Sequence, residues 1–159
     1  MRLADLSGPQ ALADRMKWWR EARFGTLVCW GPVTLKGTEI GWSRSGGRPG
    51  IGVADGEIPV EVYDNLYKQF NPVDFNANEW IAVAKAAGVR YFVFLTKHHD
   101  GFCMFDSSLT DYKITNSPFK RDVCREIADA CHQAGLKLGW YYSQPDWQHP
   151  NYFTNNHKH

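Results

Sequence analysis

Residues 87–97 read AGVRYFVFLTK, and residues 134–142 repeat the same order as AGLKLGWYY. In both stretches an Ala-Gly pair ends a helix-like segment, and a run of mainly apolar residues follows. Strands that are apolar on both faces and alternate with helices are typical of a parallel sheet covered by helices. The repeat therefore predicts an α/β fold built from successive β-α units.

The segments before these two strands carry helix signals. Asn76, with Glu79 three residues later, resembles a capping box, and Gly88 suits the end of that helix. Trp80, Val83, Ala84 and Ala87 would form its buried face. The next helix carries Val123, Ile127, Cys131 and Ala134 inward and is closed by Gly135.

Three further segments complete the outline toward the N-terminus. A helix is predicted from Pro9, with Leu12, Met16 and Trp19 on one face, and residues 24–30 predict a buried first strand. Val60, Tyr63, Tyr67 and Phe70 mark another helix. Between them, residues 31–58 hold eight glycines and two prolines, which indicates a long irregular loop of the kind that is often functional.

Length and composition exclude several classes of protein. A chain of 159 residues with 43% hydrophobic and 22% charged residues suits one globular domain. The formal net charge of +1 gives no strong field for nucleic acid or an anionic membrane. No apolar run approaches the roughly 20 residues of a membrane span, and no signal peptide is visible at the start. The four cysteines form no CxxC pair, so we expect buried thiols rather than a redox or zinc motif.

Polar and aromatic residues follow the ends of the predicted strands. Ligands bind at the carboxyl ends of strands in parallel α/β folds, both open sheets and (β/α)8 barrels. No GxGxxG or Walker loop follows a strand, which disfavours a nucleotide-binding open sheet. The candidates at these ends are Trp42, Lys97, His98, His99, Asp100, Tyr141, Tyr142, Asp146 and Trp147.

The His98-His99 pair leaves three interpretations open. One histidine could be packed and the other exposed. Both could join Asp100 and Cys103 in a metal site, although the spacing matches no zinc pattern. Both could hydrogen-bond a polyhydroxylated ligand, because a neutral imidazole donates and accepts. Trp42 and Trp147 could equally be packing residues. Asp100, Asp106, Asp111 and Asp146 could act as acid or base, but most carboxylates in loops are turn residues.

Longer motifs resemble one enzyme family. They are KWWREARFG at 17–25, WGP at 30–32, YDNLYKQFNP at 63–72, YFVFLTKHHDGFCMFDSSLTDY at 91–112 and SPFKRDVCREIADACHQAGLKLGWYYSQPDW at 117–147. The stretch from Trp18 to Tyr152 resembles the N-terminal part of the catalytic domain of glycoside hydrolase family 29, the α-L-fucosidases. KHHDGF followed by a helix and GWYYS is its most specific part.

The resemblance implies a (β/α)8 (TIM-like) barrel of which this chain would hold the first three β-α units. It implies a glycosidase that hydrolyses terminal α-L-fucose from glycans with retention, without a cofactor or metal. The partner would be a fucosylated glycan or glycoconjugate. His98 and His99 match the pair that binds fucose hydroxyls, Tyr141 matches a pocket tyrosine, and Trp42 matches a pocket tryptophan. The family is usually secreted, periplasmic or lysosomal.

Two departures from the family accompany this resemblance. Cys29 stands where the family usually has the histidine of HWG, and a thiol is a poorer hydrogen-bond donor. The nucleophilic Asp and the acid/base Glu of the family would lie beyond residue 159. We therefore expect residues 1–159 to be an N-terminal fragment of the catalytic domain that is inactive alone. A non-catalytic carbohydrate-binding remnant is the alternative, and a small metal-binding protein is a third.

Overall fold

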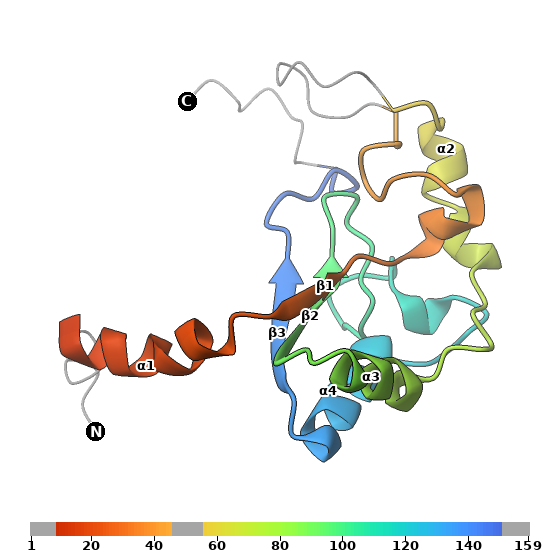
Figure 1. Cartoon of the computed structure of the whole chain (residues 1–159). Coiled ribbons are helices and arrows are strands. Elements are labelled where there is room, and N and C mark those ends of the chain that lie inside the picture. Colours follow the sequence, from red (N-terminus) through yellow and green to blue (C-terminus); the bar gives the residue numbers. More distant parts are fainter. Residues whose placement is uncertain (1–8, 46–55, 151–159) are drawn as a thin grey trace.

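The computed structural model describes residues 9–45 and 56–150 of the chain. Its centre is a sheet of three parallel strands in the order β1-β2-β3, formed by Gly25–Val28, Tyr91–Lys97 and Lys137–Tyr142. Helices α3 (Ala77–Ala86) and α4 (Val123–Ala134) lie together on one face of this sheet (Figure 1). The predicted α/β class and the parallel direction of the strands are confirmed.

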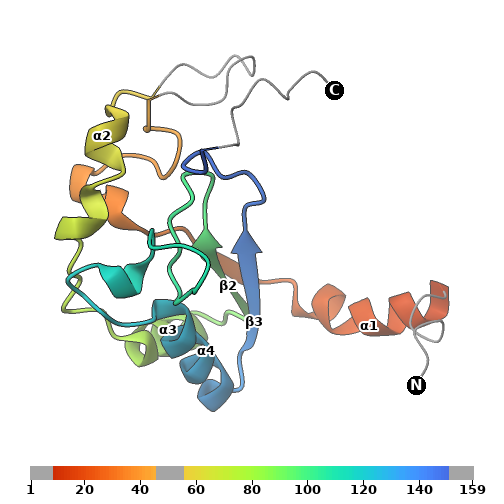
Figure 2. The ribbon, with the colours of Figure 1, turned by 180° about the vertical axis from the view of Figure 1, so that it is seen from behind.

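The register of the strands brings their carboxyl ends to one edge of the sheet. Val28 of β1 pairs with Phe94 of β2, and Leu95 of β2 pairs with Tyr141 of β3. A register shift then follows between Leu95 and Lys97. The residues after Val28, Lys97 and Tyr142 consequently leave the sheet on the same side, where Figure 2 shows the connecting loops gathered above β2 and β3.

The predicted signals at the ends of the helices are confirmed. The side chain of Asn76 accepts hydrogen bonds from the backbone N–H groups of Asn78 and Glu79, which begins α3. Asp122 accepts from Arg125 N–H at the start of α4, and Gly135 ends that helix in the left-handed conformation with φ of 64°.

The main hydrophobic core lies between the sheet and these two helices. Phe92 and Phe94 from β2 meet Ile81 of α3 and Ile127 of α4 there, and each of these side chains is fully buried. Trp30, two residues past β1, packs its ring against an aromatic group at 5.0 to 5.3 Å, which ties the first strand to α3. That group consists of Phe70, Phe75 and Trp80.

Two predicted buried faces are wrong in part. Helix α1 (Pro9–Ala22) projects away from the other elements, so Leu12 and Trp19 are exposed (Figures 1 and 2). Val83 of α3 is also exposed, because Ile81 and Ala84 supply the buried face instead. The first strand is shorter than the predicted 24–30, and it is not buried as predicted, because Phe24 and Leu27 are exposed.

Residues 31–45 of the predicted irregular loop are more ordered than its glycine content predicts, and residues 46–55 lie outside the described part of the chain. A 3₁₀ helix covers Pro32–Lys36, and the helix expected over residues 60–70 is divided into α2 (Val60–Tyr63) and a 3₁₀ turn at Leu66–Gln69. Val33, Ile58, Tyr63 and Leu66 form a second, smaller core beneath this region. It supports the loop that carries Trp42. No helix among the described residues is long and apolar enough to cross a membrane.

Candidate functional site

Five aromatic side chains meet where the carboxyl ends of the strands open to the surface. His98 and His99 stack on each other with ring centroids 4.4 Å apart, and Trp42 lies edge-on to both at 6.2 and 5.2 Å. Trp147 contacts Trp42 and His99, and Tyr141 stacks on His98 at 6.4 Å. We call Trp42, His98, His99, Tyr141 and Trp147 the His–Trp cluster.

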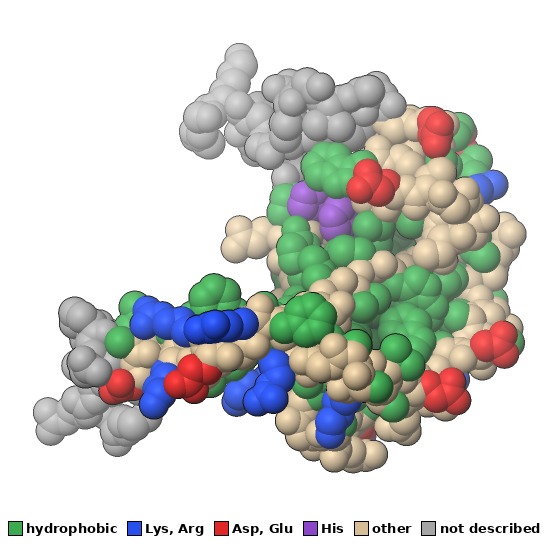
Figure 3. All heavy atoms as spheres, in the orientation of Figure 1, with side chains coloured by type: hydrophobic (Ala, Val, Ile, Leu, Met, Phe, Trp, Pro, Cys, Tyr) green, Lys and Arg blue, Asp and Glu red, His purple; other side chains and the backbone are tan. Residues whose placement is uncertain are grey.

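The end of β2 explains why two adjacent histidines point the same way. Consecutive side chains in a strand alternate between faces, but β2 ends at Lys97, so the alternation stops before His98. On the face drawn in Figure 3, purple histidine side chains lie next to each other and are bordered by hydrophobic side chains. The interpretation with one packed and one exposed histidine holds in part: His98 is buried, whereas His99 is half-buried and stacks on it.

Lys97, at the end of β2, forms hydrogen bonds and an ion pair with the segment that follows β3. Its backbone carbonyl accepts from Ser143 N–H at 2.9 Å, and its Nζ donates to Pro145 O at 3.0 Å and lies 3.7 Å from an Asp146 oxygen. Trp147 N–H then donates to His99 O at 2.7 Å. These bonds fix Trp147 against the histidines.

Several buried polar atoms around the cluster have no hydrogen-bond partner among the described residues. They are His98 Nδ1, Ser143 Oγ and Trp147 Nε1. Buried polar groups in folded proteins are nearly always hydrogen-bonded to protein, water or ligand. These atoms therefore mark the place where a polar ligand or water would complete the site.

His98 is neutral at physiological pH. Burial, together with the nearby charges of His99 and Lys97, lowers the pKa of His98 to about 4. A neutral imidazole has one N–H donor and one nitrogen acceptor. His98 can therefore both donate to and accept from a ligand hydroxyl.

The acidic residues near the cluster already have partners. Asp100 is fully buried, accepts from Tyr63 O–H and from Phe102 N–H, and has a pKa that burial raises to about 6. Asp146 is held by Lys97 and caps His149 N–H.

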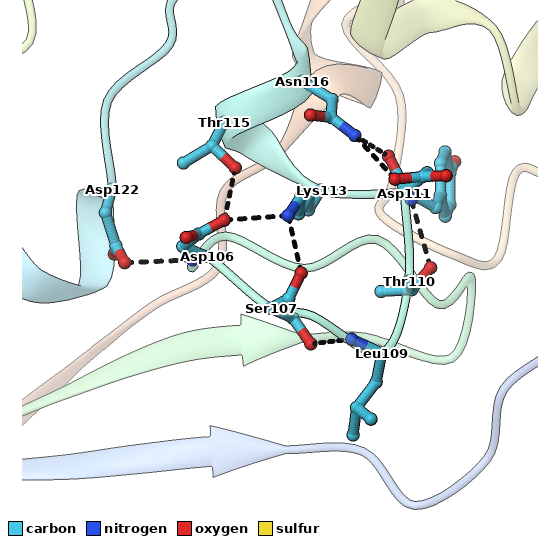
Figure 4. Close-up of polar contacts among 10 residues, drawn as sticks. Asp106, Ser107, Leu109, Thr110, Asp111, Lys113, Thr115, Asn116 and Asp122 are labelled. Carbon is cyan, nitrogen blue, oxygen red and sulfur yellow. Dashed lines mark hydrogen bonds and ion pairs between the residues drawn. The ribbon is translucent and has the colours of Figure 1, made fainter.

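Asp106 and Asp111 are loop residues (Figure 4). Asp106 accepts from Lys113 Nζ at 2.9 Å and from Thr115 O–H at 2.8 Å, and these bonds lower the pKa of its carboxyl. Asp111 accepts from the Asn116 amide. The turn-residue interpretation holds for both.

Cys29 follows β1 directly and is exposed at this end of the sheet. Partial burial and the charge of Glu39 raise the pKa of its thiol, so it is protonated at neutral pH. The other three cysteines are buried, and all four are free, in agreement with the predicted buried thiols except at Cys29.

The described residues contain no group of three or more His, Cys, Asp or Glu side chains that could hold a metal ion. His98, His99, Asp100 and Cys103, named above as a possible ligand set, are therefore not brought together as one. The sequence named Lys97, Asp100 and Trp147 as candidates, but it gave no sign that Tyr63 supports the site. The contacts of Tyr63 join segments that are far apart along the chain.

The family model and the relatives that this chain matches are described as alpha-L-fucosidases. The family model described as Alpha-L-fucosidase matches residues 9–159. A putative alpha-L-fucosidase of Caenorhabditis elegans is 31% identical over 141 residues, which are 84% of this chain and 29% of that protein. The tissue alpha-L-fucosidase of Homo sapiens is 31% identical over 142 residues, which are 85% and 30% of the two chains.

Solved structures agree with these relatives. Alpha-L-fucosidase isoenzyme 1 from Paenibacillus thiaminolyticus is 47% identical with a TM-score of 0.76, over 87% of this chain and 30% of that one. An alpha-L-fucosidase from Lactobacillus casei, in complex with its alpha-L-fucose product, is 36% identical with a TM-score of 0.69, over 87% and 43%. This chain thus spans less than half the length of each of these relatives.

Proposed function

This chain belongs to the alpha-L-fucosidase family, and we propose that it supplies the part of an α-L-fucosidase active site that binds L-fucose. The reaction would be hydrolysis of terminal α-L-fucose from glycans with retention of configuration. The catalytic nucleophile and acid/base would be contributed by residues other than the carboxylates described here, because Asp100, Asp106, Asp111 and Asp146 are engaged elsewhere.

The observation that carries this proposal is the stacked His98-His99 pair beside Trp42, Tyr141 and Trp147. Sugars present hydroxyls at their edges and C–H groups on their faces, so imidazoles and aromatic rings suit both surfaces. Trp147 Nε1, a buried polar atom with no partner among the described residues, lies in the ring that contacts His99.

We assign roles to individual residues within this proposal. His98 and His99 would hydrogen-bond fucose hydroxyls, while Tyr141 and Trp42 would line the pocket. Cys29 stands at the end of β1, within electrostatic reach of Glu39, and would be a weak contact at most.

For the fold, we propose that β1, β2 and β3 are the first three strands of a (β/α)8 barrel and that residues 1–159 form the N-terminal part of its catalytic domain. The consecutive parallel order supports this arrangement, as does the helix that follows each of the first two strands before the next one. In such barrels, active sites lie at the carboxyl ends of the strands, where the His–Trp cluster is found.

The ligand class is supported by two structures of the Lactobacillus casei relative. One holds alpha-L-fucose as product and another holds Fuca(1,6)GlcNAc. By similarity, the substrate of the protein to which this chain contributes would be a fucosylated glycan or glycoconjugate.

Calorimetric titration of the 159-residue chain with L-fucose tests this proposal. We expect saturable binding of L-fucose and no comparable binding of its mirror image, D-fucose, since hydrogen bonds to placed hydroxyls depend on configuration. His98→Ala and His99→Ala should each weaken binding by roughly 5- to 100-fold, because each leaves hydroxyls or pocket atoms unpaired at about 1–3 kcal/mol.

His132→Ala is the matched control, because His132 is exposed in the last turn of α4, away from the cluster. It should leave the affinity unchanged. Equal affinity for the two mirror-image sugars, or unchanged affinity in both cluster variants, would reject the proposal.

A further inference from the structure

A chain of buried hydrogen bonds joins three segments beneath the His–Trp cluster. Gly41 N–H donates to the Tyr63 hydroxyl at 2.7 Å, and that hydroxyl donates to Asp100 Oδ2 at 2.7 Å. Asp100 Oδ1 accepts from Phe102 N–H at 3.1 Å. Tyr63 and Asp100 are both 2% exposed, so water does not compete for these bonds.

The chemistry of the three groups fixes the direction of the chain. An ionised carboxylate only accepts hydrogen bonds, so the Tyr63 hydroxyl must donate to Asp100. Its oxygen is then available to accept from the Gly41 amide. One hydroxyl therefore connects the Trp42 loop, helix α2 and the end of β2, which lie 22 and 37 residues apart in sequence.

Gly41 is also in close contact with His98 of the His–Trp cluster. Its φ is +73°, and a Cβ placed on it would lie 2.3 Å from His98 Nδ1. The backbone at Gly41 thus lies directly against the His98 imidazole. Because Trp42 is the next residue, the position of Gly41 determines where the indole stands relative to both histidines.

We propose that Tyr63 and Asp100 are positioning residues that hold the Gly41-Trp42 backbone against His98 and so set the spacing between the tryptophan wall and the histidine pair. Neither residue needs to touch the ligand. The identity of the ligand as L-fucose rests on the function proposed above, whereas the positioning itself does not.

The first test follows Trp42 directly, by fluorine NMR of the chain labelled with 5-fluorotryptophan. Tyr63→Phe keeps the ring and removes the hydroxyl, so we expect the Trp42 resonance to shift or broaden while that of Trp30, in the main core, stays in place. Tyr67→Phe is the matched control, because the Tyr67 ring packs against Phe102 and Tyr112 in the main core. It should leave the Trp42 resonance unchanged.

Amide hydrogen exchange gives a second, local readout of the same variants. The Gly41 amide should exchange at least 10-fold faster in Tyr63→Phe than in the wild type, while strand amides such as that of Phe94 keep their protection. A general loss of stability would instead accelerate both. Unchanged Gly41 exchange together with an unchanged Trp42 resonance would overturn the proposal.

A pair of glycine variants tests the contact between Gly41 and His98 by changing Gly41 instead of Tyr63. Gly41 and Gly37 both have a positive φ, of 73° and 63°, but a Cβ on Gly37 meets nothing within 4 Å. Gly41→Ala and Gly37→Ala therefore share the backbone strain, and only Gly41→Ala presses on His98. We expect the His98 imidazole and Trp42 signals to move in Gly41→Ala alone; equal shifts in both variants would contradict the contact.

The L-fucose titration separates this inference from the function. If the wild-type chain binds L-fucose, Tyr63→Phe should weaken binding at least 5-fold and Tyr67→Phe should not. If the wild-type chain does not bind L-fucose but Tyr63→Phe still moves Trp42 and exposes the Gly41 amide, the proposed function fails and the positioning role stands. If the wild-type chain binds L-fucose and Tyr63→Phe binds it with the same affinity, the link between the positioning role of Tyr63 and L-fucose binding would be refuted.

Discussion

The protonation of His98 links its burial to its chemistry. Burial, with the charges of His99 and Lys97, holds the pKa of His98 near 4, below the ordinary value of about 6.5. Because the pKa of His98 is lower in the folded chain than in the unfolded chain, protonation of His98 favours the unfolded chain. Its contribution to the free energy of unfolding is complete above about pH 6.5 and is lost as the pH falls toward 4. We expect the His98 ring signals in proton NMR to stay constant from pH 7 to about 5 and to titrate near 4. A midpoint near 6.5 would contradict its placement.

Cys29 offers a second test at the scale of one residue. The thiol stands where the family usually has histidine, and an imidazole is a better hydrogen-bond donor than a thiol. We expect Cys29→His to tighten L-fucose binding in calorimetric titration. Cys131→Ala, a change at a buried thiol within α4, is the control and should leave the affinity as it is. An unchanged affinity in Cys29→His would place this position outside the pocket, and weaker binding would contradict the gain expected from the imidazole.

Among the elements, the loop that carries Trp42 depends on an ion pair with α2. Arg44 donates to both oxygens of Asp64 at 2.7 and 2.8 Å, and Arg44 is 5% exposed. Removing one partner of a buried pair leaves an uncompensated charge, so Asp64→Ala should lower the free energy of unfolding by about 3 kcal/mol in urea titrations. Glu21→Ala breaks the exposed pair with Lys17 and should cost much less. Equal losses would show that the Arg44 pair is not buried in solution.

The sequence predicted those elements whose signals are local. Asn76 and Gly135 act on neighbouring backbone groups, and the apolar run of β2 is contained in one stretch, so each was predicted correctly. Exposure of Leu12 and Val83 depends on which other elements cover a helix face, and no local pattern reports that. The same reason decides which site residues could be predicted. The adjacent histidines are recognisable in the sequence, whereas the role of the Tyr63 hydroxyl depends on partners that are far away in sequence.

At the scale of the whole molecule, the carboxylates of Asp100, Asp106, Asp111 and Asp146 are bonded to neighbouring residues rather than directed at the cluster. Retaining glycosidases place two carboxyl groups about 5–5.5 Å apart across the scissile bond. Asp100 bonds Tyr63, and Asp146 is held by Lys97. We therefore expect the 159-residue chain alone to release no 4-nitrophenol from 4-nitrophenyl α-L-fucopyranoside above the uncatalysed rate. If the chain did hydrolyse this substrate, and Asp100→Asn abolished the activity, a catalytic carboxyl would lie among the described residues.

The proposal that this chain supplies the fucose-binding part of an α-L-fucosidase active site is tested most directly by grafting the chain into an active relative and measuring the activity of this graft. Residues 9–150 would replace the aligned segment of the Paenibacillus thiaminolyticus enzyme, which is 47% identical to this chain, and kcat/KM would be measured on 4-nitrophenyl α-L-fucopyranoside. We expect the graft to hydrolyse this substrate, to lose roughly 10- to 100-fold in kcat/KM with His98→Ala, and to keep its activity with His132→Ala. A folded graft without turnover, or one that is indifferent to His98→Ala, would contradict the proposal.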